Sequence, residues 1–152
     1  AVSDGPVTLL IGDVALAHDI GGLLAARRLG LALTIVLLNN DGGGIFHFLP
    51  VSGERDVFEQ HVATRHGLDF ARAAELYGLR YELVGDLQGL RCALDEPRAD
   101  GDRRSRLLEV RTDRAENLAL HRRVADAAAA AVAAAAAVTE VSPTAPAASP
   151  AA

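Results

Sequence analysis

Two polar positions, each at the end of an apolar run, are the residues best placed to do chemistry. Gly12 and Asp13 follow the run VTLLI, and Asn40 ends the run LTIVLLNN just before three consecutive glycines. Asp13 offers a carboxylate oxygen, Asn40 an amide oxygen, and the glycines free backbone carbonyls. Hard oxygen ligands of this kind, with room for phosphate oxygens and water, predict a Mg²⁺ site that holds a diphosphate.

The two apolar runs are predicted to be buried parallel strands joined by a helix. Residues 7–11 and 33–38 are short and solidly apolar, which is typical of such strands. Residues 15–29 carry leucines at helical spacing, and Gly30 is a natural stop. A parallel βαβ unit brings the ends of both strands to one edge, so Asp13 and Asn40 are expected to meet there. Asp13 is also a candidate N-cap of the helix.

Three consecutive glycines, residues 42–44, follow the second strand. Glycine permits positive φ and close approach of the backbone to a ligand. The alternative is an ordinary flexible turn, but the upstream Gly-Asp and the Asn pair favour cofactor binding. The loop is not a Walker A motif, because no G-x-x-x-x-G-K-[ST] follows, and the glycine spacing does not fit a dinucleotide fingerprint.

The rest of the sequence alternates between helical and strand patterns. We predict a helix at residues 69–77, beginning at Asp69, and a helix at 87–94, capped by Asp86. Strands are predicted at 80–84 and 106–110, and a long helix at 114–138 that is nearly pure alanine in its second half. This order indicates an α/β fold, a doubly wound and mostly parallel sheet, over residues 1–138. The Pro/Ala/Ser-rich tail, residues 139–152, is predicted to be disordered.

Composition narrows the function classes. The net charge of −5 and the scattered arginines argue against a nucleic-acid or membrane-surface binder, and no stretch suits a membrane span or a secretory signal. The single cysteine, Cys92, excludes an intrachain disulfide, suits a reducing cytoplasm and is expected to be buried.

Residues 52–66 are interpreted as a mobile polar surface with a short helix at 57–61. His47, His61 and His66 are expected to be exposed and without a catalytic role.

Three collinear stretches resemble a known family. They read GDVALAHDIGGL, NNDGGGIFHFLP and FEQHVATRHGLDF, and the similarity extends over roughly residues 7–125. The spacing from Gly-Asp to Asn-Asn is similar to the cofactor signature of thiamine-diphosphate enzymes. The full sequence of the three stretches resembles the 2-succinyl-5-enolpyruvyl-6-hydroxy-3-cyclohexene-1-carboxylate synthases, the MenD-type enzymes of menaquinone biosynthesis. The resemblance implies an enzyme that decarboxylates 2-oxoglutarate and adds the succinyl unit to isochorismate.

The resemblance also implies roles for particular residues. The Mg²⁺ ligands, with Mn²⁺ as an alternative ion, would be the Asp13 carboxylate, the Asn40 side chain and the Gly42 carbonyl. The residues that bind the cofactor would be Gly12, Asp13, Val14, Ala15, Asn40, Gly42, Gly43, Gly44 and Ile45. Ile45, Phe46 and Leu49 would line the substrate side of the active site, unless they only pack in the core. No residue is assigned a catalytic role.

Two positions depart from the family's pattern. Val14 replaces the glycine of the general Gly-Asp-Gly signature, although an apolar residue suits the MenD-type branch. Ala15 stands where Ser or Thr is common, which removes one possible phosphate contact worth about 1 kcal/mol.

Part of the expected machinery lies outside this sequence. In the family, a glutamate that assists the aminopyrimidine ring comes from a pyrimidine-binding domain of another subunit, so a homo-oligomer, dimer or tetramer, is expected. About two elements that the family has before Val7 are missing. We therefore expect a C-terminal fragment, a split subunit or a disrupted gene product, inactive alone and with an exposed apolar face that favours self-association.

Two other functions stay open at this point. One is the diphosphate-binding subunit of a different thiamine-diphosphate 2-oxo-acid decarboxylase. The other is a non-catalytic remnant or interaction domain of the same fold.

Overall fold

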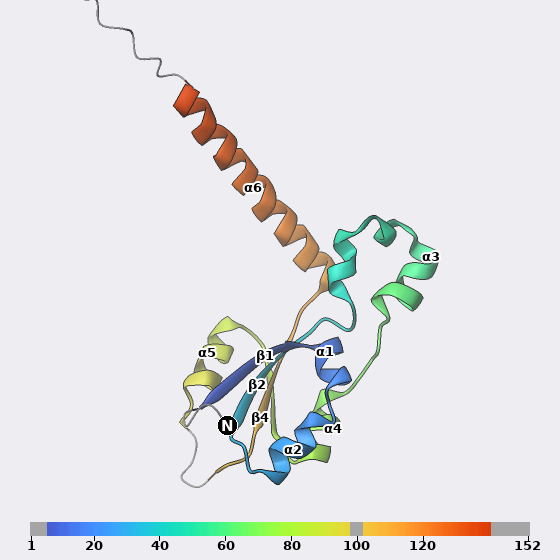
Figure 1. Ribbon diagram of the computed structural model, residues 1–152, viewed down its shortest axis with the longest axis vertical. Coiled ribbons are helices and arrows are strands. Elements are labelled where there is room, and N and C mark those ends of the chain that lie inside the picture. The colour runs from blue at the N-terminus through green and yellow to red at the C-terminus, as the bar shows by residue number, and fades with distance from the viewer. Residues whose placement is uncertain (1–5, 98–101, 141–152) are drawn as a thin grey trace, which may run out of the picture. The chain divides into compact units, whose positions relative to one another are not determined.

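The computed structural model describes residues 6–97 and 102–140. The chain forms two compact units, Ala1–Arg114 and Ala115–Ala152. The first unit contains a four-stranded parallel sheet with the strand order β1-β2-β4-β3 (Figure 1). The strands are β1 (Val7–Gly12), β2 (Leu33–Asn39), β3 (Arg80–Val84) and β4 (Arg106–Arg111). All four strands were predicted, each to within one residue at either end.

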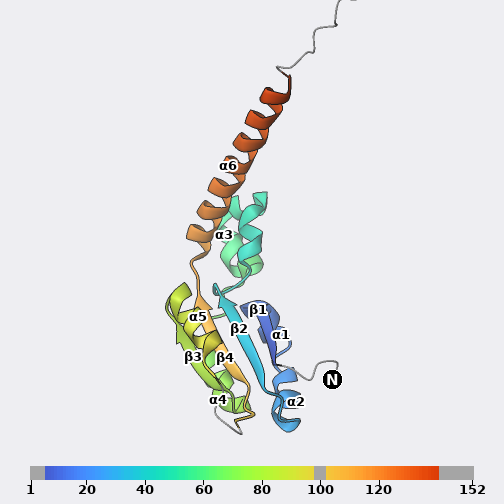
Figure 2. The same ribbon diagram turned by 90° about the vertical axis from the view of Figure 1, so that its left-hand side faces the viewer.

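Helices cover both faces of the sheet, as Figures 1 and 2 show. One face carries α1 (Asp13–His18), α2 (Gly22–Arg28) and α4 (Phe70–Tyr77), and the other carries α5 (Leu87–Asp95). Alternate residues of β2 point to opposite faces, so Ile35 packs with α1, α2 and α4 while Val36 packs with α5. The prediction of a doubly wound α/β fold is confirmed.

The single helix predicted for residues 15–29 is wrong, because the structure has two short helices there. The chain turns at residues 19–21, where the Gly22 amide donates to the Asp19 carbonyl at 2.8 Å. Two adjacent glycines, Gly21 and Gly22, weaken the helix at this point, since glycine has low helix propensity. The first helix also begins at Asp13, two residues earlier than expected. Its N-cap residue is Gly12, so Asp13 does not cap it.

Side-chain caps fix the starts of α4 and α5, as the sequence suggested. The Asp69 carboxylate accepts hydrogen bonds from the Ala71 and Arg72 amides at the start of α4, and Gly78 ends that helix with φ 72°. The Asp86 carboxylate accepts from the Gly89 amide at 2.7 Å at the start of α5. These caps determine where the chain returns to β3 and β4.

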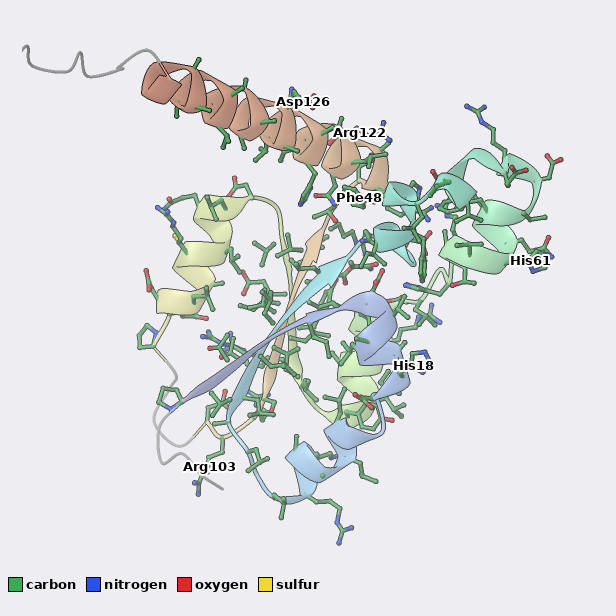
Figure 3. The ribbon with its side chains drawn as sticks, turned by 45° about the horizontal axis from the view of Figure 1, so that its top comes forward. His18, Phe48, His61, Arg103, Arg122 and Asp126 are labelled. Atoms are coloured by element: carbon green, nitrogen blue, oxygen red, sulfur yellow. The ribbon has the colours of Figure 1, made fainter. Side chains whose placement is uncertain are left out.

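The segment after the glycine loop (residues 40–44) contains more helical structure than its polar composition indicated. It contains η1 (Gly44–Phe48), η2 (Pro50–Gly53), α3 (Arg55–Val57) and η3 (Phe58–Ala63). Phe58 is only 4% exposed, and the His47 ring meets it edge-on at 4.7 Å between centroids. Most of residues 52–66 are exposed, and the helical turns at residues 55–63 include the short helix predicted at 57–61, so the predicted surface position is confirmed while its mobility stays a prediction. His47 is half-buried against Phe58, so its predicted exposure is wrong. His61 is exposed as expected and points outward in Figure 3.

Strand β1 is an edge strand with exposed apolar side chains. Leu10 is 65% exposed, and Val7 and Leu9 are also exposed. The predicted burial of the strand at residues 7–11 is therefore wrong for residues 7–10, because β1 has a neighbouring strand on one side only. Their exposure agrees with the expected apolar face, whereas self-association stays a prediction. Cys92 is a free, exposed cysteine, so its predicted burial is wrong. It lies on α5, whose inner side is taken by Ala93. The cytoplasmic setting stays a prediction.

The second unit consists of α6 (Arg114–Glu140), whose first residue closes the first unit. The predicted long helix is confirmed, and residues 119–137 are exposed throughout. The predicted disordered tail begins inside this helix, and its residues 141–152 lie outside the described part of the chain. Within residues 6–97 and 102–140, no helix combines the length and the apolar character that a membrane crossing needs.

Candidate functional site

The two polar positions predicted to meet do lie at one edge of the sheet. β1 and β2 are parallel neighbours, with Gly12 opposite Leu38 in register. Asp13 follows β1 directly, and Asn40 follows β2 directly. Both therefore lie at the carboxyl edge, where open α/β sheets bind their ligands.

Asp13 is the centre of this edge. Its side chain is buried, and its Oδ2 accepts hydrogen bonds from the amides of Asn40 at 3.1 Å and Gly42 at 3.0 Å. The same oxygen lies 3.1 Å from Nε2 of His66, while Oδ1 accepts, among the residues that the structure describes, only from the Val14 amide at 2.8 Å. Asp13 thus brings the three predicted metal-binding residues together. Its Oδ1 has fewer hydrogen-bond contacts than its Oδ2.

Asn40 supplies an oxygen that is ready for a cation. Its Oδ1 is buried and has no hydrogen-bond partner among the described residues. An unpaired buried acceptor is costly, which makes a missing ligand the physical explanation. The Gly42 carbonyl accepts from the Gly44 amide at 2.9 Å and keeps its second lone pair. A carboxylate, an amide and a carbonyl oxygen together fit Mg²⁺. Their assignment as ligands stays a prediction.

The glycine loop is tightly packed and is not an ordinary flexible turn. Gly42 has φ 133°, and a Cβ there would strike the carbonyl oxygen of Ala63. A Cβ at Gly43 would lie 2.6 Å from the Phe46 ring, and one at Gly44 would lie 2.6 Å from Nδ2 of Asn40. The Gly43 amide also donates to Ala63 at 2.7 Å. Glycine is therefore required at residue 42 by its φ and by the backbone contact, whereas a side chain at residue 43 or 44 would have to displace Phe46 or Asn40.

His66 belongs to this site, contrary to its predicted place on a solvated surface. Its side chain is 15% exposed and contacts the Asp13 carboxylate. The Leu68 amide donates to Nδ1 at 3.0 Å, so the neutral ring carries its hydrogen on Nε2 and donates it to Asp13. The residue is 53 positions from Asp13, and nothing in its local pattern showed that the fold brings it back.

Asp41 anchors the loop on its outer side. It adopts φ 60°, a conformation that few residues other than glycine hold without support. Its carboxylate accepts from Arg65 Nε and from the Gly67 amide, each at 2.8 Å. The hydrogen bonds from Arg65 and Gly67 hold the pKa of Asp41 below its ordinary value. Asp41 therefore ties the loop to residues 65–67.

A buried carboxylate, Glu109, lies near the same edge and was missed by the sequence analysis. It is fully buried in β4, and its carboxylate accepts from Asn39, Tyr81 and Arg111. Burial, and then the hydrogen bond to Glu109, raise the pKa of Tyr81 to about 12. The available signal was an acidic residue inside the apolar strand pattern RLLEV.

The residues predicted to line the substrate side lie in and just after η1. Ile45 is 74% exposed, Leu49 49% and Phe46 39%, so packing in the core does not explain why these three positions are apolar. The Phe46 ring lies against Gly43, in contact with the glycine loop. Their role toward a substrate stays a prediction.

Two hollows flank the loop. One, of about 210 Å³, is lined by Val14, Ala17, His18, Thr64 and His66, and it adjoins Asp13 through His66. The other, of about 430 Å³, is lined by residues 39–41, 65, 67–68 and 111–114. A third hollow, of about 390 Å³, is lined in part by Arg103 at the amino edge, away from every predicted site residue (Figure 3).

Comparison with known proteins identifies relatives of the chain. The family described as "Thiamine pyrophosphate enzyme, C-terminal TPP binding domain" matches residues 1–110; thiamine pyrophosphate is another name for thiamine diphosphate. A 2-succinyl-5-enolpyruvyl-6-hydroxy-3-cyclohexene-1-carboxylate synthase of Rubrobacter xylanophilus is 51% identical over 124 residues, which cover 82% of this chain and 21% of that protein. The synthase of Bacillus velezensis is 45% identical over 123 residues, which cover 81% of this chain and 21% of that protein. The chain thus spans about one fifth of these relatives.

Solved structures give the same fold. The thiamine diphosphate-dependent 4-hydroxybenzoylformate decarboxylase of Rhodococcus jostii RHA1 is 28% identical with a TM-score of 0.56, and the match covers 72% of this chain and 20% of that one. The benzoylformate decarboxylase of Polynucleobacter necessarius is 21% identical with a TM-score of 0.52 and the same coverage. The second likeness supports the fold alone.

Proposed function

This chain belongs to the family of thiamine pyrophosphate enzyme C-terminal TPP-binding domains, and we propose that it is the diphosphate- and Mg²⁺-binding part of a 2-succinyl-5-enolpyruvyl-6-hydroxy-3-cyclohexene-1-carboxylate synthase. The observation that carries the proposal is the meeting of Asp13, Asn40 and Gly42 at the carboxyl edge, with the Asn40 oxygen buried and unpaired. The identity of 51% to a synthase favours this branch over other enzymes of the family.

In this proposal the chain anchors the cofactor. Asp13 through Oδ1, Asn40 through its side chain and Gly42 through its carbonyl would hold Mg²⁺, or Mn²⁺ in its place, against the diphosphate. The contacts to the cofactor itself would come from Gly12, Asp13, Val14, Ala15, Asn40, Gly42, Gly43, Gly44 and Ile45. When bound, thiamine diphosphate supplies the carbanion chemistry that decarboxylates a 2-oxo acid, while the protein binds and orients it.

The substrates in this proposal are 2-oxoglutarate and isochorismate. The exposed apolar side chains of Ile45, Phe46 and Leu49 would cover the reacting groups and exclude water from them. The glutamate that assists the aminopyrimidine would come from a pyrimidine-binding domain of another subunit, within a homo-oligomer. Glu59 of this chain does not take that role, because its carboxylate pairs with Arg114 at 2.8 Å.

The test is a synthase assay on the whole polypeptide in which this sequence occurs, with 2-oxoglutarate, isochorismate, thiamine diphosphate and Mg²⁺. We expect product formation that requires all four additions, and tight cofactor binding only when Mg²⁺ is present. Residues 1–152 alone are expected to give no product.

Other outcomes contradict the proposal in recognisable ways. Release of an aldehyde from a 2-oxo acid without use of isochorismate would identify a decarboxylase instead. Absence of Mg²⁺-dependent binding of thiamine diphosphate would identify a non-catalytic domain.

A further inference from the structure

Glu109 is an unusual residue for its position. In register it lies between Leu37 of β2 and Leu83 of β3, in the middle of an otherwise apolar row across the sheet. Its exposure is 0%, and burying a carboxylate is costly unless hydrogen bonds replace its water. An apolar residue would fill this row at lower cost. The carboxylate must therefore be explained by what it contacts.

The contacts of Glu109 occupy both carboxylate oxygens. Oε1 accepts from Asn39 Nδ2 at 2.9 Å and from Arg111 Nε at 2.7 Å, and Oε2 accepts from the Tyr81 hydroxyl at 2.7 Å. Burial raises the pKa of Glu109, but these three hydrogen bonds outweigh it and leave the pKa below its ordinary value. Glu109 is thus a charged acceptor held at a fixed place in the sheet.

Among these partners, Asn39 is the one that connects Glu109 to the glycine loop. While Nδ2 of Asn39 donates to Glu109, its Oδ1 accepts from the Asp41 amide at 3.0 Å. The Asn39 carbonyl accepts from the Thr112 amide at 2.9 Å, so β4 and the residue after it hold Asn39 at two points. A continuous path of hydrogen bonds therefore runs from the sheet through Asn39 into the backbone of Asp41.

This path complements the one from Asp13. Asp13 holds the amides of residues 40 and 42, and Asn39 holds the amide of residue 41, which has the unfavourable φ of 60°. The three amides alternate between two anchors at the ends of neighbouring strands. Without the Asn39 anchor, Asp41 loses one of the bonds that maintain its positive φ, and of these two anchors only Asp13 still holds the residues on either side of it.

We propose that Glu109 is a positioning residue, which acts through Asn39 to fix the loop at residues 39–42 in the shape that presents Asn40 and Gly42 to the metal and diphosphate. This inference rests on the proposed function and deepens it. The ion pair with Arg111 also stabilises the carboxylate, but the Arg111 side chain is 62% exposed, and among the hydrogen bonds of the described residues only those of Asn39 connect Glu109 to the loop.

The test compares substitutions in the whole polypeptide by calorimetric titration with thiamine diphosphate in the presence of Mg²⁺. Glu109→Leu removes the acceptor, and we expect the Kd to rise by about 10- to 100-fold, as for other residues that orient metal ligands. Glu109→Gln keeps an oxygen for Asn39, and its amide donates to the Tyr81 hydroxyl. We expect this conservative change to restore the Kd to within about fivefold of the wild type.

The matched control is Arg106→Met, at the other end of the same strand. Arg106 is also a buried charge with three hydrogen bonds, to Thr34, Ala93 and Leu94, but it contacts nothing at the glycine loop. We expect it to lower stability without changing the Kd of the folded protein. Equal Kd values for Glu109→Leu and the wild type, with a loss of stability like that of Arg106→Met, would show a structural role only and overturn the proposal.

A second readout does not require the cofactor. Amide hydrogen exchange at Asp41 and Gly42 is expected to be at least about tenfold faster in Glu109→Leu than in the wild type, and unchanged in Arg106→Met. Unchanged exchange at both amides would overturn the positioning role. If the wild type does not bind thiamine diphosphate but exchange accelerates as expected, the proposed function fails while the link from Glu109 to the loop stands.

Discussion

The two edges of the sheet both contain buried polar residues, but they use them differently. At the amino edge, Ser105 donates to the Leu31 carbonyl at 2.7 Å and Arg106 donates to Thr34 and two carbonyls. At the carboxyl edge, Asp13 and Glu109 hold backbone and side-chain groups of one loop, and the Asn40 oxygen is left buried and unpaired. The buried polar groups of the amino edge are paired within the fold, whereas the carboxyl edge contains a buried acceptor with no partner among the described residues, which we propose binds a ligand.

Backbone conformation separates the two edges in the same way. The positive φ values of Asp41 and Gly42, and the contacts that exclude a Cβ from Gly42, Gly43 and Gly44, are concentrated at the carboxyl edge. Gly30 at the amino edge also has positive φ, but a Cβ there would meet nothing within 4 Å. A positive φ that hydrogen bonds hold at the non-glycine residue Asp41 thus marks the candidate site, whereas the positive φ of Gly30 is readily adopted by glycine and only ends a helix.

The largest expected effect comes from removing the centre of the carboxyl edge. Asp13→Ala deletes a predicted metal ligand and leaves the amides of Asn40 and Gly42 without their acceptor. We expect the Kd for thiamine diphosphate with Mg²⁺ to rise at least about 100-fold in the whole polypeptide, measured by calorimetric titration. Asp19→Ala, an exposed aspartate at the end of the same helix, is the control and should bind normally. Normal binding by Asp13→Ala would remove Asp13 from the site.

A change of similar chemistry at the amino edge should affect stability alone. Arg106→Met removes the donor to two buried acceptors, Thr34 and Ala93, and to the partly buried Leu94 carbonyl, so we expect the free energy of unfolding to fall by about 2–3 kcal/mol. Urea unfolding followed by circular dichroism measures it. Arg103→Met, three residues earlier and exposed, should change the free energy by less than about 0.5 kcal/mol. Loss of cofactor affinity in Arg106→Met would abolish the contrast between the edges.

At the carboxyl edge, substitution of Phe46 distinguishes a role toward the substrate from a role in packing. Because its ring is 39% exposed, Phe46→Ala should cost less than about 2 kcal/mol of stability, compared with about 3–5 kcal/mol for a fully buried phenylalanine. If the ring covers the substrate, kcat/KM should fall about tenfold, which corresponds to about 1.4 kcal/mol. Phe48→Ala, at a similarly exposed neighbour, is the control. The reverse pattern, a large loss of stability with normal activity, would make Phe46 a core residue.

The smallest effect is expected at an exposed ion pair of the amino edge. Hydrogen bonds from the Arg104 side chain and amide lower the pKa of Asp102 from 3.8 to about 2. A carboxyl whose pKa is lowered by folding stabilises the protein above the unfolded pKa and loses this effect as pH falls. Asp102→Asn should therefore lower the thermal midpoint slightly and equally between pH 5 and 8. The difference should shrink to roughly half at pH 3. A difference that grows in acid would contradict this sign.

Local sequence patterns determined most of the secondary structure and part of the site. Short runs rich in apolar residues predicted all four strands, because the strands of a parallel sheet carry apolar side chains, although only β2 and β4 are mostly buried. Asp69 and Asp86 marked helix starts, because their carboxylates satisfy amides only a few residues away. The meeting of Asp13 and Asn40 also followed from the sequence, since parallel neighbours place their ends at one edge. The break at Gly21 and Gly22 was visible in the sequence but was outweighed by the spacing of the leucines.

Tertiary structure alone decided the contacts that cross long stretches of sequence. His66 reaches Asp13 over 53 residues, and Glu109 reaches Asn39 over 70, so neither partner is encoded by local spacing. The burial of Phe58 and His47 and the exposure of Cys92 depended equally on which segments pack together. Backbone preferences act over a few residues, whereas hydrogen bonds between side chains act wherever the fold places them. The sequence therefore located the edge at which we propose that a ligand binds, and the fold decided which residues hold that edge in shape.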